Sequence, residues 1–312
     1  MRILLLFSIF TVSLFAISSV NKFRASAFIL DMILKDNTLY VSTTGGTVES
    51  FDISNKKHNT IAKLKPLINF FDEEYDAKIY SIDINKNGDF LLLAEASGGN
   101  RRVLIFKDNS IVKLAGLNKN AIYKEARFVD EHRILLATLS NEVSLYDITK
   151  GKIIYTKALS SYSFSDFSLN KNLVAITGES GDVYIFDYEN KKVVKVLSGA
   201  NKDNIYSIDY KLGSILTAGQ DKYVGIYDMK SEKFKRVKTT FLVYACALSV
   251  DAKFSAYMSN EDSQITVIDN ESLNILAKLD GHKSTINRII FASNNHLFSS
   301  ADDGEILEWI FK

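Results

Sequence analysis

The sequence predicts an all-β protein folded as a seven-bladed β-propeller, in which the N-terminal strand completes the last blade and closes the ring. Three observations predict this fold. A short phrase recurs seven times, the interval between copies contains four short strand-like runs, and sustained helical spacing of apolar residues is confined to the segment 1–18. Repeats of about 40 residues with four strands each are the sequence signature of propellers.

The recurring phrase is an apolar residue, two further residues, an aromatic residue and an aspartate. Clear copies occupy 48–52, 143–147, 183–187 and 224–228, and weaker copies occupy 103–107, 265–269 and 306–310. The copies therefore end at positions 52, 107, 147, 187, 228, 269 and 310. Chance matches would scatter, whereas every interval after the first is about 40 residues, which indicates a true repeat.

One period reads as a four-stranded meander. Alternating runs at 205–210, 214–219, 223–228 and 234–237 are separated by turns rich in Gly, Asp and Lys. The chain stops shortly after the seventh phrase, so the last blade lacks its fourth strand. Exposed edge strands are prone to aggregation. We therefore predict that Val20 to Ala25 supplies this outer strand.

The composition excludes several classes of protein. The 312 residues are 46% hydrophobic and 24% charged, which argues against a disordered or low-complexity chain. With 38 Lys and Arg against 37 Asp and Glu, the formal charge of +1 provides no overall attraction for nucleic acid. The single cysteine, Cys246, cannot form an internal disulfide.

The segment 1–18 has the pattern of a signal peptide. Arg2 precedes an uncharged apolar run, Ile3 to Ile17, and small residues follow at the end of this run. Cleavage after Ser18 would leave a propeller domain of residues 19–312 that is formally neutral, because Arg2 is removed. An uncleaved anchor is the alternative, but the run is short for a membrane span. We expect an exported protein without a stable membrane anchor after cleavage, and the absence of disulfides favours a bacterial periplasm.

The seventh repeat resembles a WD40 repeat. It opens with Gly281-His282, continues through the strand and turn at 297–303, and ends at Trp309. In the WD40 family a His, a Ser or Thr, an Asp and a Trp form a hydrogen-bonded network inside the blade, and the resemblance assigns these roles to His282, Ser299, Asp303 and Trp309. The fifth repeat keeps Thr217 and Asp221 at the same offsets, with Tyr227 in place of Trp. In its overall architecture, the chain resembles the WD40 family over residues 19–312.

In general character, the exported, degenerate WD40 chain without disulfides is similar to NapL, a group of accessory proteins encoded with periplasmic nitrate reductases in some bacteria. This similarity implies protein partners from the periplasmic nitrate reductase system and a role in its assembly or activity. We expect a monomer that acts as a binding scaffold and binds no nucleic acid.

The sequence shows no convergent catalytic or metal-binding residues. His58, His132 and His296 lie in separate predicted turns, so three or four converging zinc ligands are not apparent. Cys246 lies in an apolar run and is expected to be buried and unreactive. We therefore expect no catalytic residue, no cofactor and no metal. The alternative is a propeller hydrolase or lactonase that uses carboxylates or a metal ion in the central channel.

The long first interval, from 52 to 107, indicates an insertion between the first two blades. It contains Pro66, the only proline, together with the apolar pair Phe70-Phe71 and four acidic residues between 72 and 76. Long loops in compact domains are commonly functional. Exposed aromatic residues would suit a protein contact, whereas the alternative is that both rings fold back onto the second blade.

A tyrosine recurs near the start of the first strand of four repeats. These residues are Tyr80, Tyr123, Tyr206 and Tyr244, each preceded by Ile or Val. The first strand of each blade lines the channel of a propeller, so the tyrosines are candidates for a partner-binding ring at one mouth. The alternative is that they pack between blades. Together with Phe70 and Phe71, they form our set of candidate partner-binding residues.

Overall fold

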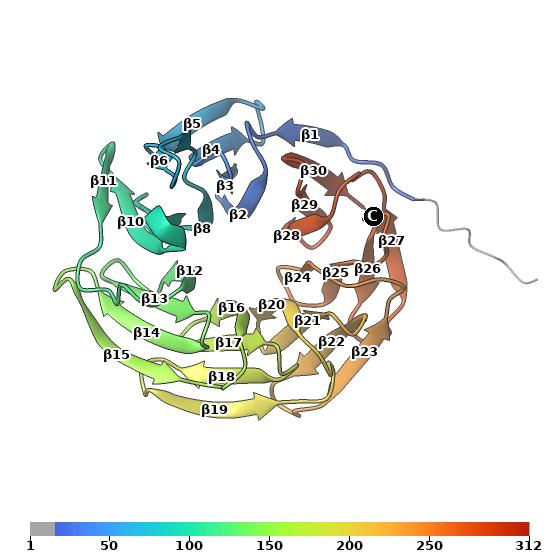
Figure 1. Ribbon diagram of the computed structural model, residues 1–312. Helices are drawn as coiled ribbons and strands as arrows, with labels where there is room; N and C mark the ends of the chain where they lie inside the picture. Colours follow the sequence, from blue (N-terminus) through green and yellow to red (C-terminus); the bar gives the residue numbers. More distant parts are fainter. Residues whose placement is uncertain (1–15, 312) are drawn as a thin grey trace, which may run out of the picture.

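The computed structural model describes residues 16–311 of the chain. These residues form seven four-stranded antiparallel sheets arranged as blades around a central channel, as Figure 1 shows. The fold is therefore the predicted all-β, seven-bladed propeller. Within residues 16–311 the only helical segment is a single 3₁₀ turn, Ser97–Gly99, and no helix is long and apolar enough to cross a membrane.

Each of the first four blades is a meander of four consecutive strands. Blade one contains β2 (Ile29–Lys35), β3 (Thr38–Thr43), β4 (Thr47–Asp52) and β5 (His58–Lys63). Blade two contains β8 (Ile79–Ile84), β9 (Phe90–Glu95), β10 (Arg101–Lys107) and β11 (Ser110–Lys113). Blade three contains β12 (Tyr123–Phe128), β13 (Arg133–Thr138), β14 (Glu142–Asp147) and β15 (Lys152–Ala158). Blade four contains β16 (Phe164–Asn170), β17 (Leu173–Gly178), β18 (Val183–Asp187) and β19 (Lys192–Leu197).

The remaining blades follow the same order until the last one. Blade five contains β20 (Ile205–Lys211), β21 (Ser214–Gly219), β22 (Tyr223–Asp228) and β23 (Phe234–Lys238). Blade six contains β24 (Cys246–Leu248), β25 (Phe254–Met258), β26 (Ile265–Asp269) and β27 (Ile275–Leu279). Blade seven contains β28 (Ile286–Ser293), β29 (His296–Ala301) and β30 (Glu305–Ile310), and its outer strand is β1 (Asn21–Arg24).

The N-terminal strand closes the ring as predicted. β1 pairs antiparallel with β30, with Asn21 opposite Glu308 and Arg24 opposite Glu305. Figure 1 shows this blue strand lying beside the red C-terminal strands. Closure covers the edge that β30 would otherwise expose, and edge strands are the sites where sheets aggregate.

The recurring phrase is the third strand of each blade, and its aromatic residue and aspartate have separate roles. The aromatic rings of Phe51, Tyr146 and Phe186 are buried between blades. The aspartates accept hydrogen bonds from backbone N–H groups in the following turn, as Asp147 does from Lys150 at 2.9 Å. Such side-chain to backbone bonds favour a tight turn before the outer strand.

The core is divided among the blade interfaces. Within the described residues, seven clusters of buried apolar side chains lie between adjacent blades, one for each contact around the ring. The last of these joins Phe23 of β1, Phe298 and Ile306 of blade seven, and Ile29 of blade one. Burial of these side chains is the main stabilisation of the ring.

The predicted signal peptide lies almost entirely outside the described residues and stays a prediction. The described part begins with Ala16, and Ile17 forms a parallel bridge with Leu279 of β27. The Ile17 N–H donates to the Lys278 carbonyl at 2.7 Å, and Ile17 packs against the cluster between blades six and seven. Cleavage after Ser18 would remove this contact.

Candidate functional site

One face of the ring carries the mouth of the channel, where the first strand of each blade begins. One residue near the start of the first strand lines this mouth in each of the seven blades; in blade six it lies two residues before the strand begins. We call these residues the mouth ring: Leu30, Tyr80, Lys124, Ser165, Tyr206, Tyr244 and Asn287. They surround a cavity of about 210 Å³.

A β-bulge explains why this position faces the channel. In six blades the register between the first and second strands shifts at a residue of the mouth ring, and blade seven has one further shift near the end of its first strand. Examples are Tyr80, between Ile79 and Ser81, and Tyr206, between Ile205 and Ser207. A bulge leaves one residue unpaired and redirects its side chain.

The structure places three of the four candidate tyrosines in the mouth ring. Tyr80, Tyr206 and Tyr244 are half-buried there, and the rings of Tyr206 and Tyr244 stack with their centroids 4.9 Å apart. Tyr123 occupies the preceding register position, is 2% exposed, and packs between blades two and three. Tyr123 was predicted to line the channel mouth, but Lys124 occupies that position instead.

Below the mouth ring, charged side chains from four blades meet across the channel. We call this set the channel network: Asp31, Glu125, Arg127, Asp166 and Arg288. Arg127 lies 3.0 Å from Asp31 and 2.8 Å from Glu125. Arg288 lies 3.0 Å from Asp31 and 3.8 Å from Asp166.

Aspartates of the channel also connect neighbouring blades. Each of four aspartates accepts a hydrogen bond from a backbone N–H on the first strand of the next blade. The pairs are Asp31 with Ile82 at 3.0 Å, Asp83 with Phe128 at 2.7 Å, Asp166 with Ile208 at 3.0 Å and Asp209 with Leu248 at 2.9 Å. Charge-assisted bonds of this kind are stronger than neutral ones, so these side chains hold the ring together.

The pKa shifts follow from this arrangement. Burial would raise the pKa of Asp31, but Arg127 and Arg288 outweigh it and hold that pKa below its usual value. Burial raises the pKa of Glu125 well above its usual value, the charge of Arg127 opposes the rise, and Asp166 adds to it. Burial likewise raises the pKa of the Cys246 thiol, so the thiolate needed for reactivity is disfavoured.

The channel carboxylates are thus bound to arginines and backbone amides. A hydrolase would need a carboxylate free to move a proton or to bind a metal ion. Within residues 16–311, no group of three or more His, Cys, Asp and Glu side chains has the arrangement of a metal site. The geometry of the network favours a structural role in joining blades.

Two histidines that were expected in turns lie in strands instead. His58 begins β5, and its Nε2 lies 2.7 Å from Glu49 Oε2 of β4. His296 begins β29, and its Nε2 lies 2.8 Å from Glu308 Oε1 of β30. Each imidazole is thus paired with a carboxylate of the neighbouring strand in its own blade. His132 lies in a turn, as expected.

The insertion forms a two-stranded hairpin on the mouth face. β6 (Leu67–Ile68) pairs with β7 (Glu74–Tyr75), and the side chain of Asn69 accepts hydrogen bonds from the N–H groups of Phe71 and Glu73 at 2.8 and 3.0 Å. We call residues 67–75 the Phe hairpin. Phe70 and Phe71 at its tip are 95% and 78% exposed, and their rings contact each other edge to face at 5.7 Å.

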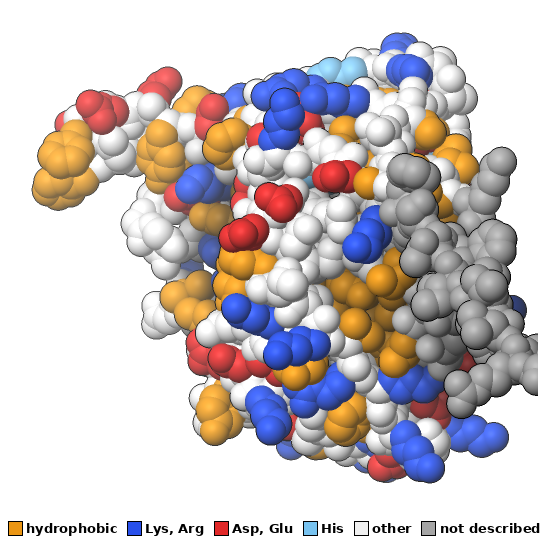
Figure 2. Space-filling view, turned by 90° about the vertical axis from the view of Figure 1, so that its right-hand side faces the viewer, with side chains coloured by type: hydrophobic (Ala, Val, Ile, Leu, Met, Phe, Trp, Pro, Cys, Tyr) orange, Lys and Arg blue, Asp and Glu red, His pale blue; other side chains and the backbone are white. Residues whose placement is uncertain are grey.

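Figure 2 shows a segment at the upper left that projects from the rest of the surface, with hydrophobic side chains at its end and acidic side chains beside them. This is the composition of the Phe hairpin, in which Asp72, Glu73 and Glu74 follow the two phenylalanines. The alternative in which both rings fold back onto blade two does not occur.

The residues assigned to the blade network come together in blade seven. His282 Nε2 lies 2.7 Å from Ser299 Oγ, and the Trp309 indole N–H donates to the same oxygen at 2.8 Å. The Asp303 carboxylate instead accepts from the Glu305 N–H at 3.0 Å, and His282 Nδ1 is buried without a partner among residues 16–311. Three of the four residues therefore form the hydrogen-bonded set.

Blade five contains a related network that the sequence analysis missed. Asn201 takes the place of the histidine, because its side chain accepts from Thr217 Oγ1 at 2.6 Å and donates to Asp221 at 2.9 Å. Asn201 precedes β20 at the same offset at which His282 precedes β28. Asparagine supplies both a donor and an acceptor in a short side chain.

The channel network and the place of Lys124 in the mouth ring were likewise not predicted from the sequence. The sequence feature that could have revealed them is the presence of charged residues inside the first strands of blades, such as Glu125 and Arg127 in β12. The meeting of Asp31 with Arg127 and Arg288 depends on ring closure, since these residues are far apart in the chain.

The seven meanders close into a β-propeller ring, and the buried network of blade seven is like that of a WD40 repeat. In agreement, residues 273–309 match the family described as WD domain, G-beta repeat. The chain is similar to a WD repeat-containing protein 55 homolog from Dictyostelium discoideum, with 23% identity over 236 residues. It is also similar to PAN2, the catalytic subunit of the PAN2-PAN3 deadenylation complex, from Kluyveromyces lactis, with 29% identity over 168 residues.

These matches cover 73% and 48% of this chain, but only 56% and 14% of the two relatives. The chain thus spans about half of the first relative and a small part of the second. Both relatives are eukaryotic proteins, which points away from a bacterial periplasmic protein. The expected periplasmic location is therefore wrong, and the absence of disulfides was too weak an indicator to support it.

Proposed function

We propose that this WD40-type propeller is a non-catalytic scaffold that binds a protein partner on its mouth face. The observation that carries the proposal is the exposure of Phe70 and Phe71 at the tip of an ordered hairpin. Two large aromatic side chains that remain in water cost free energy unless they are covered, and aromatic residues are enriched among the residues that dominate protein interfaces.

The mouth ring supplies further contacts on the same face. Tyr80, Tyr206 and Tyr244 present half-buried rings with little rotamer freedom left to lose. In a meander propeller, the links between successive blades all lie on the face where the first strands begin, and the Phe hairpin is one of these links. A partner that covers the hairpin can therefore also reach the channel mouth.

The comparisons agree with a scaffold but do not identify the partner. One relative is named as a WD repeat protein, and the other is the catalytic subunit of a complex, of which this chain matches only 14%. Neither concerns nitrate reduction. The proposal therefore does not extend to the nitrate reductase accessory role implied by the similarity to NapL.

The test is quantitative affinity capture from the source cells with tagged wild-type protein and two variants. F70S/F71S removes both exposed rings. L212S removes an apolar side chain that is 72% exposed in the turn between β20 and β21, on the opposite face, and serves as the control. We expect capture of the partner to fall by about tenfold or more for F70S/F71S and to be unchanged for L212S. Equal capture by all three proteins would refute the proposed surface.

A further inference from the structure

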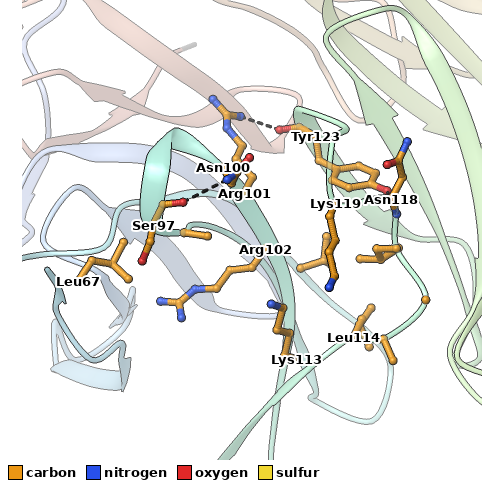
Figure 3. A pocket seen from close by; sticks show the side chains of 15 residues that line it. Leu67, Ser97, Asn100, Arg101, Arg102, Lys113, Leu114, Asn118, Lys119 and Tyr123 are labelled. Atoms are coloured by element: carbon orange, nitrogen blue, oxygen red, sulfur yellow. Dashed lines mark hydrogen bonds between the residues drawn. The ribbon is translucent and has the colours of Figure 1, made fainter. Parts of the chain in front are cut away.

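A second cavity, with a volume of about 700 Å³, lies on the mouth face between blades two and three. Its walls are the turn between β9 and β10, the linker from β11 to β12, the start of β12, and Leu67 of the Phe hairpin. Figure 3 shows the side chains that line it. We call this cavity the basic pocket.

The charged side chains of the lining are all positive. The basic pocket is lined by Arg101, Arg102, Lys113 and Lys119, and by no Asp or Glu. Within residues 16–311, none of Arg102, Lys113 and Lys119 forms an ion pair, although most other arginines of the ring do. Figure 3 shows the amines of Lys113 and Lys119 near one another, and the Arg102 guanidinium extending toward the side of the pocket where Leu67 lies.

The Arg102 guanidinium is only partly compensated by its protein surroundings. Its Nε is buried and has no hydrogen-bond partner among the described residues. A buried donor without a partner is energetically unfavourable, and more so when it belongs to a charged group. An anion in the pocket would offset the mutual repulsion of the cations.

The pocket is held open by its own walls. Leu114 N–H donates to the Val103 carbonyl at 3.0 Å, and the Tyr146 hydroxyl donates to the Ala115 carbonyl at 2.8 Å. The Asn118 N–H donates to the Tyr123 hydroxyl at 3.2 Å. These bonds position the linker that carries Lys113 and Lys119, so a ligand would meet a preformed site.

The rest of the lining combines apolar side chains with the polar Ser97, Asn100 and Asn118. Leu67, Leu114 and Leu117 face the cavity together with part of Tyr123, which is otherwise buried. A small inorganic anion would leave most of this surface uncovered. A ligand that matches the whole pocket carries negative charge and an apolar group side by side.

We propose that the basic pocket binds an acidic segment of a partner protein, in which Asp or Glu residues flank an apolar side chain. The inference rests on the proposed function, because the same partner would cover the Phe hairpin and the mouth ring. A peptide fits better than a single-stranded nucleic acid, since the pocket offers leucines where base binding uses exposed aromatic rings.

The test measures fluorescence anisotropy of a labelled peptide with four glutamates around a central leucine. A second peptide carries glutamine at the four acidic positions, and a nine-nucleotide oligouridine is the third ligand. We expect the wild-type protein to bind the glutamate peptide, to bind it less tightly as salt screens the charges, and to bind the glutamine peptide about tenfold or more weakly.

The triple variant R102Q/K113Q/K119Q should weaken binding of the glutamate peptide by about tenfold or more. The matched control, K152Q/K157Q/K192Q, removes the same charge from exposed lysines on β15 and β19 of blades three and four. It should bind like wild type. Thermal melting of both variants establishes that they fold.

Three outcomes overturn the inference: equal binding of both peptides, equal weakening by the two triple variants, and tighter binding of oligouridine than of the glutamate peptide. The proposed function is tested separately by F70S/F71S. Suppose that F70S/F71S loses the captured partner while R102Q/K113Q/K119Q binds the peptide with full affinity. The proposed role of the basic pocket is then refuted, and the proposed scaffold function is supported. If R102Q/K113Q/K119Q weakens peptide binding as expected but F70S/F71S captures the partner normally, the proposed binding surface at the Phe hairpin is refuted.

Discussion

The guanidinium carbon of Arg101 lies 3.8 Å from the centre of the Tyr80 ring. The Arg101 Nη1 also donates to the Tyr123 carbonyl at 2.9 Å, across the boundary between blades two and three. Burial lowers the pKa of Arg101, yet the side chain stays charged far above neutral pH. This contact joins the mouth ring to the basic pocket, so the two features form one continuous surface.

The first prediction concerns the tyrosines of the mouth ring. Y80A/Y206A should reduce partner capture by about tenfold or more, while its melting temperature stays close to that of wild type, because both rings are only half-buried. Y80F/Y206F keeps the rings and should retain binding. A large loss of stability in the alanine variant would instead assign the tyrosines to packing between blades.

The second prediction concerns the channel network. R127M should lower the free energy of unfolding by about 3–5 kcal/mol, since it leaves the buried Glu125 without its arginine and removes one of the two arginines that pair with Asp31. Because the pKa of folded Asp31 is depressed, its stabilising contribution is present above pH 3.8 and disappears as the pH falls through the folded value. The deficit of R127M should therefore shrink in acid.

The control for R127M is R133M. Arg133 pairs with Asp130 and Glu189 at the surface, both at 2.7 Å, and such exposed pairs contribute about 0–1 kcal/mol. Urea unfolding at pH 7 should separate the two variants clearly. Equal destabilisation would show that the channel network contributes no more than a surface ion pair.

The third prediction concerns the pH dependence of blade seven. Burial lowers the pKa of His282 to about 4, whereas an unfolded histidine titrates near 6.5. Above pH 6.5 the side chain is neutral in both states. As the pH falls from 6.5 to 4, only the unfolded chain takes up the proton, and the free energy of unfolding falls by about 3 kcal/mol.

H282N should flatten this part of the pH profile, since asparagine does not titrate and Asn201 already performs the same role in blade five. Urea unfolding at several pH values between 7.5 and 4.5 measures the effect. H132N alters an exposed turn residue and should leave the profile unchanged. An identical pH profile for H282N and wild type would contradict the assignment.

The fourth prediction concerns ring closure. Phe23 of β1 is 5% exposed and packs against Phe51 with ring centroids 5.8 Å apart. F23A should lower the free energy of unfolding by about 3–5 kcal/mol and increase aggregation, because it loosens the strand that covers β30. V20A, at a position that is 49% exposed, should change stability little. Similar stability of both variants would argue against closure through β1.

The regular features of the fold were predictable because each is local. The phrase that ends at Asp147 contains its own buried aromatic residue and its own turn-forming aspartate, so its spacing reveals a blade without reference to other blades. The break in that spacing likewise located the Phe hairpin. Its exposure could not be predicted, since Phe70 and Phe71 are as apolar as the residues of the core.

The register of blade three could not be predicted from the pattern alone. Ile122-Tyr123 matches Ile79-Tyr80 in sequence, yet the bulge of β12 falls at Lys124, between Tyr123 and Glu125. A shift of one residue moves a side chain to the other face of a strand. Tyr123 is therefore buried, and a lysine faces the channel in its place.

The sequence by itself determined the number of blades, the closing strand and the position of the insertion, because these follow from repeated local patterns of apolar, aromatic and turn residues. Only the tertiary structure decided which side chains meet in the channel and in the basic pocket. Asp31, Arg127 and Arg288 come from blades one, three and seven, and they become neighbours because closure of the ring brings distant first strands around one axis.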